Sequence, residues 1–317
     1  MKRITKALAV VMSAAAFAGS AYAADKVYRV AYIARTQSDS FASWLLDSAK
    51  IVVKKYPDMK MDFFDGQNDN EKIRTHMENA ITNKYDAILL HPNDPEAQVA
   101  PAHEALDAGL TVVAVNTIVN SKRVPMVDAN PYEQGAVNAR YAAKIVPKNA
   151  KAVVLLGPAG NRHSQERHES WKKEFFAVRP DVKILDTQIG NWNKEEGMKL
   201  MEDWIQAYGD DIGIIVSMND NMVLGALEAY KGSNKKLPLA FGVDGTADAG
   251  LAIKDGTLVS TSLQSAYDLA QLSVEMVHDF VTKKKTKPEL VIVPNPLYTK
   301  ENVEGLLKIH RDRGLIK

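Results

Sequence analysis

The sequence contains no cysteine among its 317 residues. It can therefore form no disulfide bond, has no thiolate nucleophile and cannot bind a metal through cysteine. Of its seven histidines, His163 and His168 are five residues apart, which places them on different faces of a helix and argues against a zinc pair. The acidic stretch 65–71 has its glycine at the second position, whereas a calcium loop needs it at the sixth, so we expect an ordinary turn. We predict no metal site and no cofactor.

The sequence also lacks the common catalytic motifs. It has no G-x-S-x-G elbow, no G-x-x-x-x-G-K-[ST] phosphate loop and no G-x-G-x-x-G after a strand. We therefore expect a protein that is not an enzyme. An excess of positive charge is missing too: without the basic residues of the first 23 positions, 37 Lys and Arg stand against 39 Asp and Glu. That balance gives no reason to expect binding to nucleic acid or to an anionic membrane.

The first 23 residues have the pattern of a secretory signal peptide. A basic start with Lys2, Arg3 and Lys6 is followed by the apolar stretch 7–18 and by the small-residue cleavage pattern of 21–23. No later stretch approaches the roughly 20 apolar residues of a membrane span. We expect an exported mature chain that begins at Ala24.

Strand-like and helix-like segments alternate through the rest of the chain, and the pattern restarts at Ala152. Such alternation predicts parallel sheets covered by helices, and two runs of similar length predict two lobes. No Pro/Gly/Ser-rich linker separates the halves, which suggests short hinge segments and closure around a ligand. The predicted strands are 27–33, 61–64, 87–90, 111–115, 124–127, 152–156, 182–187, 212–216, 239–243, 258–263 and 289–293.

The segment 212–230 illustrates the pattern. A β-branched, uncharged strand at 212–216 breaks at Ser217, and helical spacing follows, with Asp220 or Asn221 as the predicted N-cap. Ligands of open parallel sheets bind outside the carboxyl ends of the strands. Asn219 and its neighbours are therefore either capping residues or part of a ligand site.

Polar and aromatic side chains follow most of the other predicted strands. Amides, carboxylates and guanidinium groups can pair with sugar hydroxyls, and an aromatic ring can pack on the apolar face of a sugar. For Trp44 and Trp192 taken singly, packing in the core is an equally good interpretation. The candidate residues at the strand ends are Arg35, Asp39, Phe41, Trp44, Asn116, Arg167, Trp192, Asn219, Asp244 and Gln264.

Several of these segments together resemble periplasmic sugar-binding proteins of the ribose/galactose-binding type. The resemblance covers nearly the whole mature chain and is carried by the stretches 91–97, 127–130, 219–227 and 242–246, with Phe41, Arg167 and Gln264. It implies an α/β fold of two doubly wound parallel-sheet lobes joined by three hinge segments. The implied limits are 1–23 for the signal peptide, 24–129 with 265–292 for the N-terminal lobe, and 130–264 with 293–317 for the C-terminal lobe.

The resemblance also implies a function and partners. A protein of this kind captures a small sugar between its lobes in the periplasm and delivers it to the membrane permease of an ATP-driven importer. It would act as a monomer and would not bind nucleic acid. In some relatives such a protein also binds a chemoreceptor, which is therefore a further candidate partner. Asp39, Phe41, Asn116, Arg167, Trp192, Asn219, Asp244 and Gln264 match sugar-contacting positions, with Phe41 and Trp192 as the stacking rings.

Some positions depart from ribose receptors. Asn116-Thr117 stands where those proteins have an Asp-Arg pair, and Ala42 replaces a second phenylalanine, a ring that Trp44 could supply. Arg35 is an additional candidate. We therefore expect a neutral monosaccharide or polyol other than ribose, with a sugar acid or another sugar-like signal for chemotaxis or sensing as the alternative.

Overall fold

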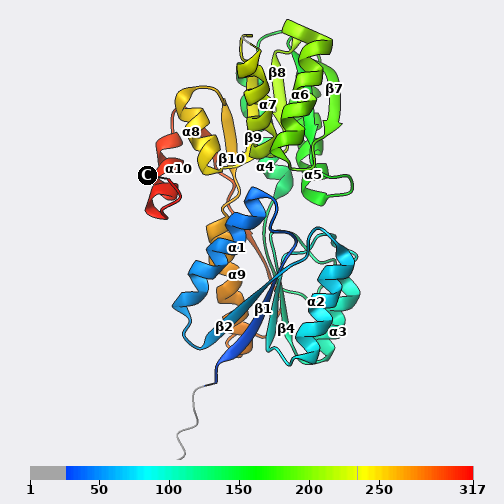
Figure 1. Ribbon diagram of the computed structural model, residues 1–317, viewed down its shortest axis with the longest axis vertical. Coiled ribbons are helices and arrows are strands. Elements are labelled where there is room, and N and C mark those ends of the chain that lie inside the picture. Colours follow the sequence, from blue (N-terminus) through cyan, green and yellow to red (C-terminus); the bar gives the residue numbers. More distant parts are fainter. Residues whose placement is uncertain (1–25, 234, 317) are drawn as a thin grey trace, which may run out of the picture.

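The computed structural model describes residues 26–233 and 235–316 of the chain, which it folds into two α/β lobes (Figure 1). The predicted signal peptide and the predicted start of the mature chain at Ala24 lie outside the described residues. Each lobe is built on a six-stranded sheet, with strand orders β11-β5-β4-β3-β1-β2 and β12-β10-β9-β8-β6-β7. In both sheets the strands follow one another outward in both directions from the first strand of the lobe, so the predicted fold class is confirmed.

The first lobe has helices on both faces of its sheet (Figure 1). Helices α1 and α9 share one buried apolar cluster with the sheet, and α2 and α3 share another on the opposite face. Its inner strands are mostly buried on both sides, which explains their short and largely apolar sequences, whereas the edge strands β2 and β11 are partly exposed. The elements are β1 (Tyr28–Ala34), α1 (Ser40–Val52), β2 (Met59–Asp65), α2 (Asn70–Thr82), β3 (Ala87–Leu90), α3 (Val99–Asp107), β4 (Thr111–Val115), β5 (Met126–Ala129), α9 (Ala266–Val281) and β11 (Leu290–Val293).

The second lobe repeats this plan around one large apolar cluster. Its helix α5 continues into a π-helical segment at Lys172–Phe176. The elements are α4 (Pro131–Ile145), β6 (Lys151–Leu156), α5 (Arg162–Trp171), β7 (Lys183–Ile189), α6 (Lys194–Tyr208), β8 (Ile214–Ser217), α7 (Asp220–Gly232), β9 (Leu239–Asp244), α8 (Ala247–Asp255), β10 (Ser260–Leu263), β12 (Leu297–Thr299) and α10 (Val303–Asp312).

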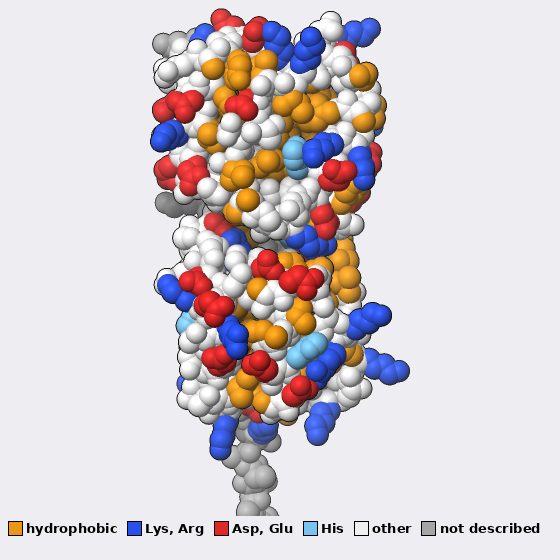
Figure 2. All heavy atoms as spheres, turned by 90° about the vertical axis from the view of Figure 1, so that its right-hand side faces the viewer, with side chains coloured by type: hydrophobic (Ala, Val, Ile, Leu, Met, Phe, Trp, Pro, Cys, Tyr) orange, Lys and Arg blue, Asp and Glu red, His pale blue; other side chains and the backbone are white. Residues whose placement is uncertain are grey.

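The chain passes from one sheet to the other after β5, after β10 and after β11. The residue limits of the two lobes stay a prediction. One strand was not predicted: β12 is only three residues long and pairs antiparallel with β10 at the sheet edge. Figure 2 shows the lobes as two bodies meeting across a band with charged side chains of both signs.

Side-chain caps begin three helices at the carboxyl ends of the strands. Asp39 accepts a hydrogen bond from the amide of Ala42, and Asn161 and Asn219 cap α5 and α7 in the same way. These caps satisfy helix amides that would otherwise lack partners, and they hold polar side chains where the two sheets face each other. Among the described residues, none of the helices is both long and apolar enough to span a membrane.

Candidate ligand-binding site

A cavity lies between the lobes, at the carboxyl ends of strands from both sheets. The space between its lining atoms is about 430 Å³, part of which opens to solvent. Its lining includes nine of the ten residues that the sequence analysis singled out. The full lining is Arg35, Asp39, Phe41, His91, Pro92, Asn116, Thr117, Asn161, His163, Arg167, Trp192, Asn219, Asp244 and Gln264.

Trp44 is the exception. It does not line this cavity; its ring packs edge-on against Phe41, with ring centroids 6.0 Å apart, and lies 5.3 Å from the ring of His310 in α10. The hypothesis that Trp44 replaces the missing second phenylalanine of the cavity is therefore not supported by its position. Phe41 and Trp192 are the two aromatic side chains of the lining.

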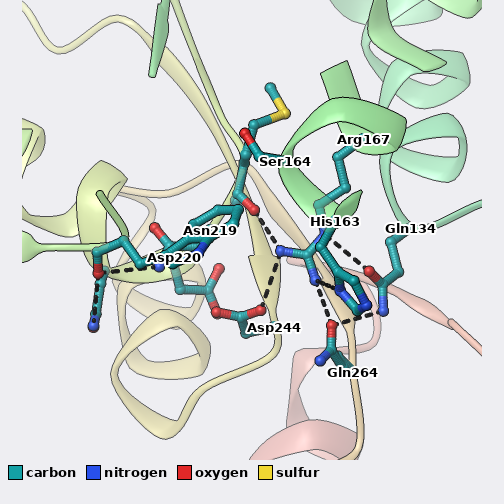
Figure 3. Close-up of polar contacts among 12 residues, drawn as sticks. Gln134, His163, Ser164, Arg167, Asn219, Asp220, Asp244 and Gln264 are labelled. Atoms are coloured by element: carbon teal, nitrogen blue, oxygen red, sulfur yellow. Dashed lines mark hydrogen bonds and ion pairs between the residues drawn. The ribbon is translucent and has the colours of Figure 1, made fainter. Parts of the chain in front are cut away.

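Arg167 of α5 is the centre of the polar network (Figure 3). Its Nε donates to Gln134 Oε1 at 2.8 Å, and its Nη1 donates to the carbonyl of Met218 at 2.6 Å and lies 3.6 Å from Asp244 Oδ1. Its Nη2 donates to Gln264. Burial lowers the pKa of Arg167, and Asp244 opposes that effect. Four partners fix the plane of the guanidinium group and leave its edge at the cavity.

Gln264 carries this network from one lobe to the other. It follows β10 at a crossing segment, and its amide nitrogen donates to Asn116 of the first lobe. Asn116 in turn donates through Nδ2 to His91 Nε2 at 3.0 Å. Since Nε2 accepts, the proton of the neutral imidazole is on Nδ1, which has no partner among the described residues and is buried.

Arg35 and Asp39 form an ion pair on the first-lobe side of the cavity. Arg35 Nη1 also donates to Asn68 Oδ1 at 2.5 Å, and one oxygen of Asp39 caps α1 at 2.7 Å from the amide of Ala42. Both charged groups are therefore already held by protein partners. They present polar edges to the cavity without an uncompensated charge.

A second pair of charged contacts connects the lobes. Asp128 of β5 is fully buried, and Arg162 Nη1 donates to its Oδ2 at 2.7 Å. His163 Nε2 lies 3.6 Å from Asp128 Oδ1, too far for a hydrogen bond, while its Nδ1 is 3.4 Å from Arg167 Nη2. Burial is the main cause of two pKa shifts here. It lowers the pKa of His163 and holds the pKa of His91 well below its ordinary value.

The segment at the start of α7 differs from the sequence prediction. The N-cap is Asn219, whose Oδ1 accepts from the amide of Met222 at 3.0 Å, and not Asp220 or Asn221. Asn219 also lines the cavity, so one side chain combines the two interpretations left open above. Asp220 lies behind it, where it accepts hydrogen bonds from Thr246 and Thr261.

Both carboxylates on this side of the cavity are buried. Burial raises the pKa of Asp220 to about 7 and raises the pKa of Asp244 well above its ordinary value, although Arg167 counteracts the second effect. The backbone here is strained as well. Asp244, Trp192 and Asn116 have positive φ angles of 123°, 63° and 68°, which residues with a side chain rarely adopt.

Five lining residues were not predicted: His91, Pro92, Thr117, Asn161 and His163. Four of them follow strands and could have been included by position alone. His163 lies one helical turn before Arg167, so the arginine was its only signal. No cluster of possible metal ligands occurs within the described residues.

Known proteins share this architecture. The family described as "Periplasmic binding protein domain" matches residues 30–285. The ribose import binding protein of Bacillus subtilis is 29% identical over 230 residues, 72% of this chain and 74% of that protein. The xylitol-binding protein of Mycolicibacterium smegmatis is 27% identical over 238 residues, 75% of this chain and 68% of that protein.

Solved structures agree with these relatives. The solute-binding protein of an ABC transporter from Bacillus halodurans, solved with bound myo-inositol, is similar with a TM-score of 0.83 and 26% identity, covering 90% of this chain and 99% of that one. The chain therefore belongs to the periplasmic binding protein family, among the sugar-binding proteins of ABC transporters, which bind their substrates and are not enzymes.

Proposed function

We propose that this protein captures a small neutral sugar or polyol between its lobes by hinge closure and delivers it to an ABC importer. The observation that carries the proposal is the pairing of charges around the cavity. Arg35 is paired with Asp39, and Arg167 lies 3.6 Å from Asp244. A carboxylate ligand would have to compete with these partners, whereas hydroxyls can bond to the remaining edges of all four groups.

The composition of the lining supports a sugar or a polyol in particular. Asn116, Asn219 and Gln264 supply amides, and Phe41 and Trp192 supply rings. A ligand with a hydroxylated edge and an apolar face matches this combination. The ribose, xylitol and myo-inositol named for the relatives are all neutral polyhydroxyl compounds.

The proposal includes the ligand-contacting roles of the nine lining residues of the sequence analysis, and action as a monomer in the periplasm. Intrinsic tryptophan fluorescence tests the ligand class, because Trp192 lines the cavity. Pentoses, hexoses, furanoses, polyols and sugar acids are titrated, and each hit is recovered after incubation. We expect a saturable change with a neutral compound that is returned unchanged, and a thermal shift equivalent to ~2.7 kcal/mol at 100 times its Kd.

Delivery is tested by uptake. Cells of the source organism that lack this chain should lose import of the identified compound in labelled form, and a plasmid copy should restore it. A copy with Asp244→Asn should not. Unchanged uptake in the deletion strain, with the chemotactic response lost instead, would favour the sensing role.

A further inference from the structure

His310 of α10 is almost fully buried, and it contacts both lobes. Its Nε2 lies 2.8 Å from the carbonyl oxygen of Gly245, in the turn directly after Asp244. On its other side, the imidazole ring lies 5.3 Å from the ring of Trp44 in α1 of the first lobe. Nε2 faces a carbonyl oxygen and therefore donates, while Nδ1 has no partner among the described residues. Burial lowers the pKa of His310, which favours the neutral ring with its lone pair on Nδ1.

The turn that His310 contacts has an unfavourable backbone. Asp244 has a φ angle of 123°, which residues with a side chain rarely adopt, and it is followed by Gly245 at 71°, an angle that glycine adopts without strain. The amide of Gly245 donates to Thr261 Oγ1 at 3.0 Å, and the amide of Thr246 donates to Asp220 Oδ2 at 2.8 Å. The bond from His310 satisfies the carbonyl between these amides. A strained turn persists only where surrounding contacts hold it, so the direction of the Asp244 carboxylate depends on these bonds.

The contact with Trp44 reaches the other side of the same cavity. Trp44 packs edge-on against Phe41, which lines the cavity from the first lobe, as Asp244 does from the second. A second contact lies nearby: the guanidinium of Arg313, directly after α10, lies 4.0 Å from the ring centroid of Tyr267 in α9. Helix α10 stands beside α8 on the side of the second lobe that faces α1 (Figure 1).

We propose that His310 is a positioning residue for ligand binding, which holds the Asp244 turn through Gly245 and sets its place relative to the first lobe through Trp44. His310 does not line the cavity and acts through the turn. The consequence for affinity rests on the proposed function. The consequence for the turn itself does not.

Two substitutions separate the two contacts of His310. In His310→Phe, the ring contact with Trp44 is kept and the donor to Gly245 is lost. In His310→Gln, the side-chain amide can still reach the carbonyl, while the ring is lost. His103→Gln is the matched control, because His103 bonds to Ser121 within the first lobe, at 2.7 Å.

Amide hydrogen exchange without any ligand tests the contact with the turn. We expect the Gly245 and Thr246 amides to exchange roughly tenfold faster in His310→Phe than in the parent chain, and at the parent rate in His310→Gln and His103→Gln. Thermal unfolding shows whether each variant is folded. Unchanged exchange in a folded His310→Phe, or equally fast exchange throughout the second lobe, would overturn the proposal.

Binding of the sugar or polyol identified above tests the effect on affinity. We expect His310→Phe to weaken binding about tenfold when it is introduced into the parent chain. Introduced into the Asp244→Asn variant, it should weaken binding little further. His310→Gln and Trp44→Leu should each weaken binding by roughly threefold, and together by no more than either alone. Additive losses in either pair would show a merely structural role. If the parent chain binds no such compound, the proposed function fails, and the exchange result still decides the role of His310 in the turn.

Discussion

Arg167 Nη1 lies 3.6 Å from Asp244 Oδ1, and each of these side chains is at most 4% exposed. A charged group buried this deeply is stabilised only while its partners remain. We therefore expect the pair to contribute to folding and, under the proposed function, to ligand binding, and substitutions of its two members should have different effects.

Arg167→Ala should abolish most of the affinity and also reduce the free energy of unfolding, by roughly 3–5 kcal/mol, because it leaves the buried Asp244 carboxylate without its counter-charge and Gln134 Oε1 without its donor. Asp244→Asn should reduce the affinity at least tenfold with a much smaller loss of stability. Burial already raises the pKa of this carboxyl, and Arg167 keeps its bonds to Gln134, the Met218 carbonyl and Gln264. Calorimetric titration and urea unfolding measure both quantities. Arg74→Ala removes an exposed ion pair and is the control. If both site variants bind like the parent, the assigned site is wrong.

Gly157→Ala tests the stacking role of Trp192. A Cβ atom at Gly157 would lie 2.2 Å from Trp192 Cζ2, so the ring must move. The ring also lies 5.6 Å from the guanidinium carbon of Arg167, a contact that movement would weaken. We expect at least a tenfold loss of affinity and an altered tryptophan emission. Gly232→Ala, where nothing lies within 4 Å of the added carbon, should bind like the parent. Equal affinities of the two variants would argue against ring stacking.

The histidines of the cavity predict a dependence of stability on pH. Burial lowers the pKa of His91 and of His163 in the folded chain below the ordinary value of about 6.5. Below pH 6.5 the unfolded chain therefore binds more protons, and the folded state loses up to ~1.4 kcal/mol per pH unit for each histidine. This stabilisation is complete above pH 6.5 and is lost as the pH falls toward the folded-state values.

Asp220 acts in the opposite direction, because its pKa is raised to about 7 and its contribution is lost as the pH rises toward that value. The histidine contribution is therefore measured as a difference between variants. The free energy of unfolding of the parent minus that of His91→Gln, determined in urea from pH 5 to 8, should shrink as the pH falls below 6.5. A difference that stays constant over this range would contradict the assignment.

The periodicity of the sequence predicted the two sheets because strands buried on both faces must be short and apolar, as 87–90 and 111–115 are. It missed β12, since three residues after Pro296 carry no detectable strand pattern. Polar residues at strand ends predicted most of the cavity, because parallel strands bring their carboxyl ends to the same edge.

Contacts between distant segments could not be predicted in this way. Trp44 is three residues after Phe41, close enough on a helix surface to suggest a common role. Nothing in the sequence indicates that α10, more than 250 residues later, places His310 against the Trp44 ring. The N-cap of α7 was misplaced by one or two residues for a similar reason. Asp220 is a good capping residue by type, but its carboxylate is bonded to Thr246 and Thr261 of the neighbouring elements.

The central claim is that the cavity selects a neutral polyhydroxyl ligand because its arginines are already paired. The most direct test is calorimetric titration of the mature chain with matched pairs of compounds, each a neutral sugar or polyol and its own carboxylic acid. We predict saturable binding of one ligand per chain for a neutral member, at least a hundredfold weaker binding of its acid, and at least tenfold weaker binding of the neutral member in Asp244→Asn. Tighter binding of the acids, or no binding of any neutral member, would contradict the claim.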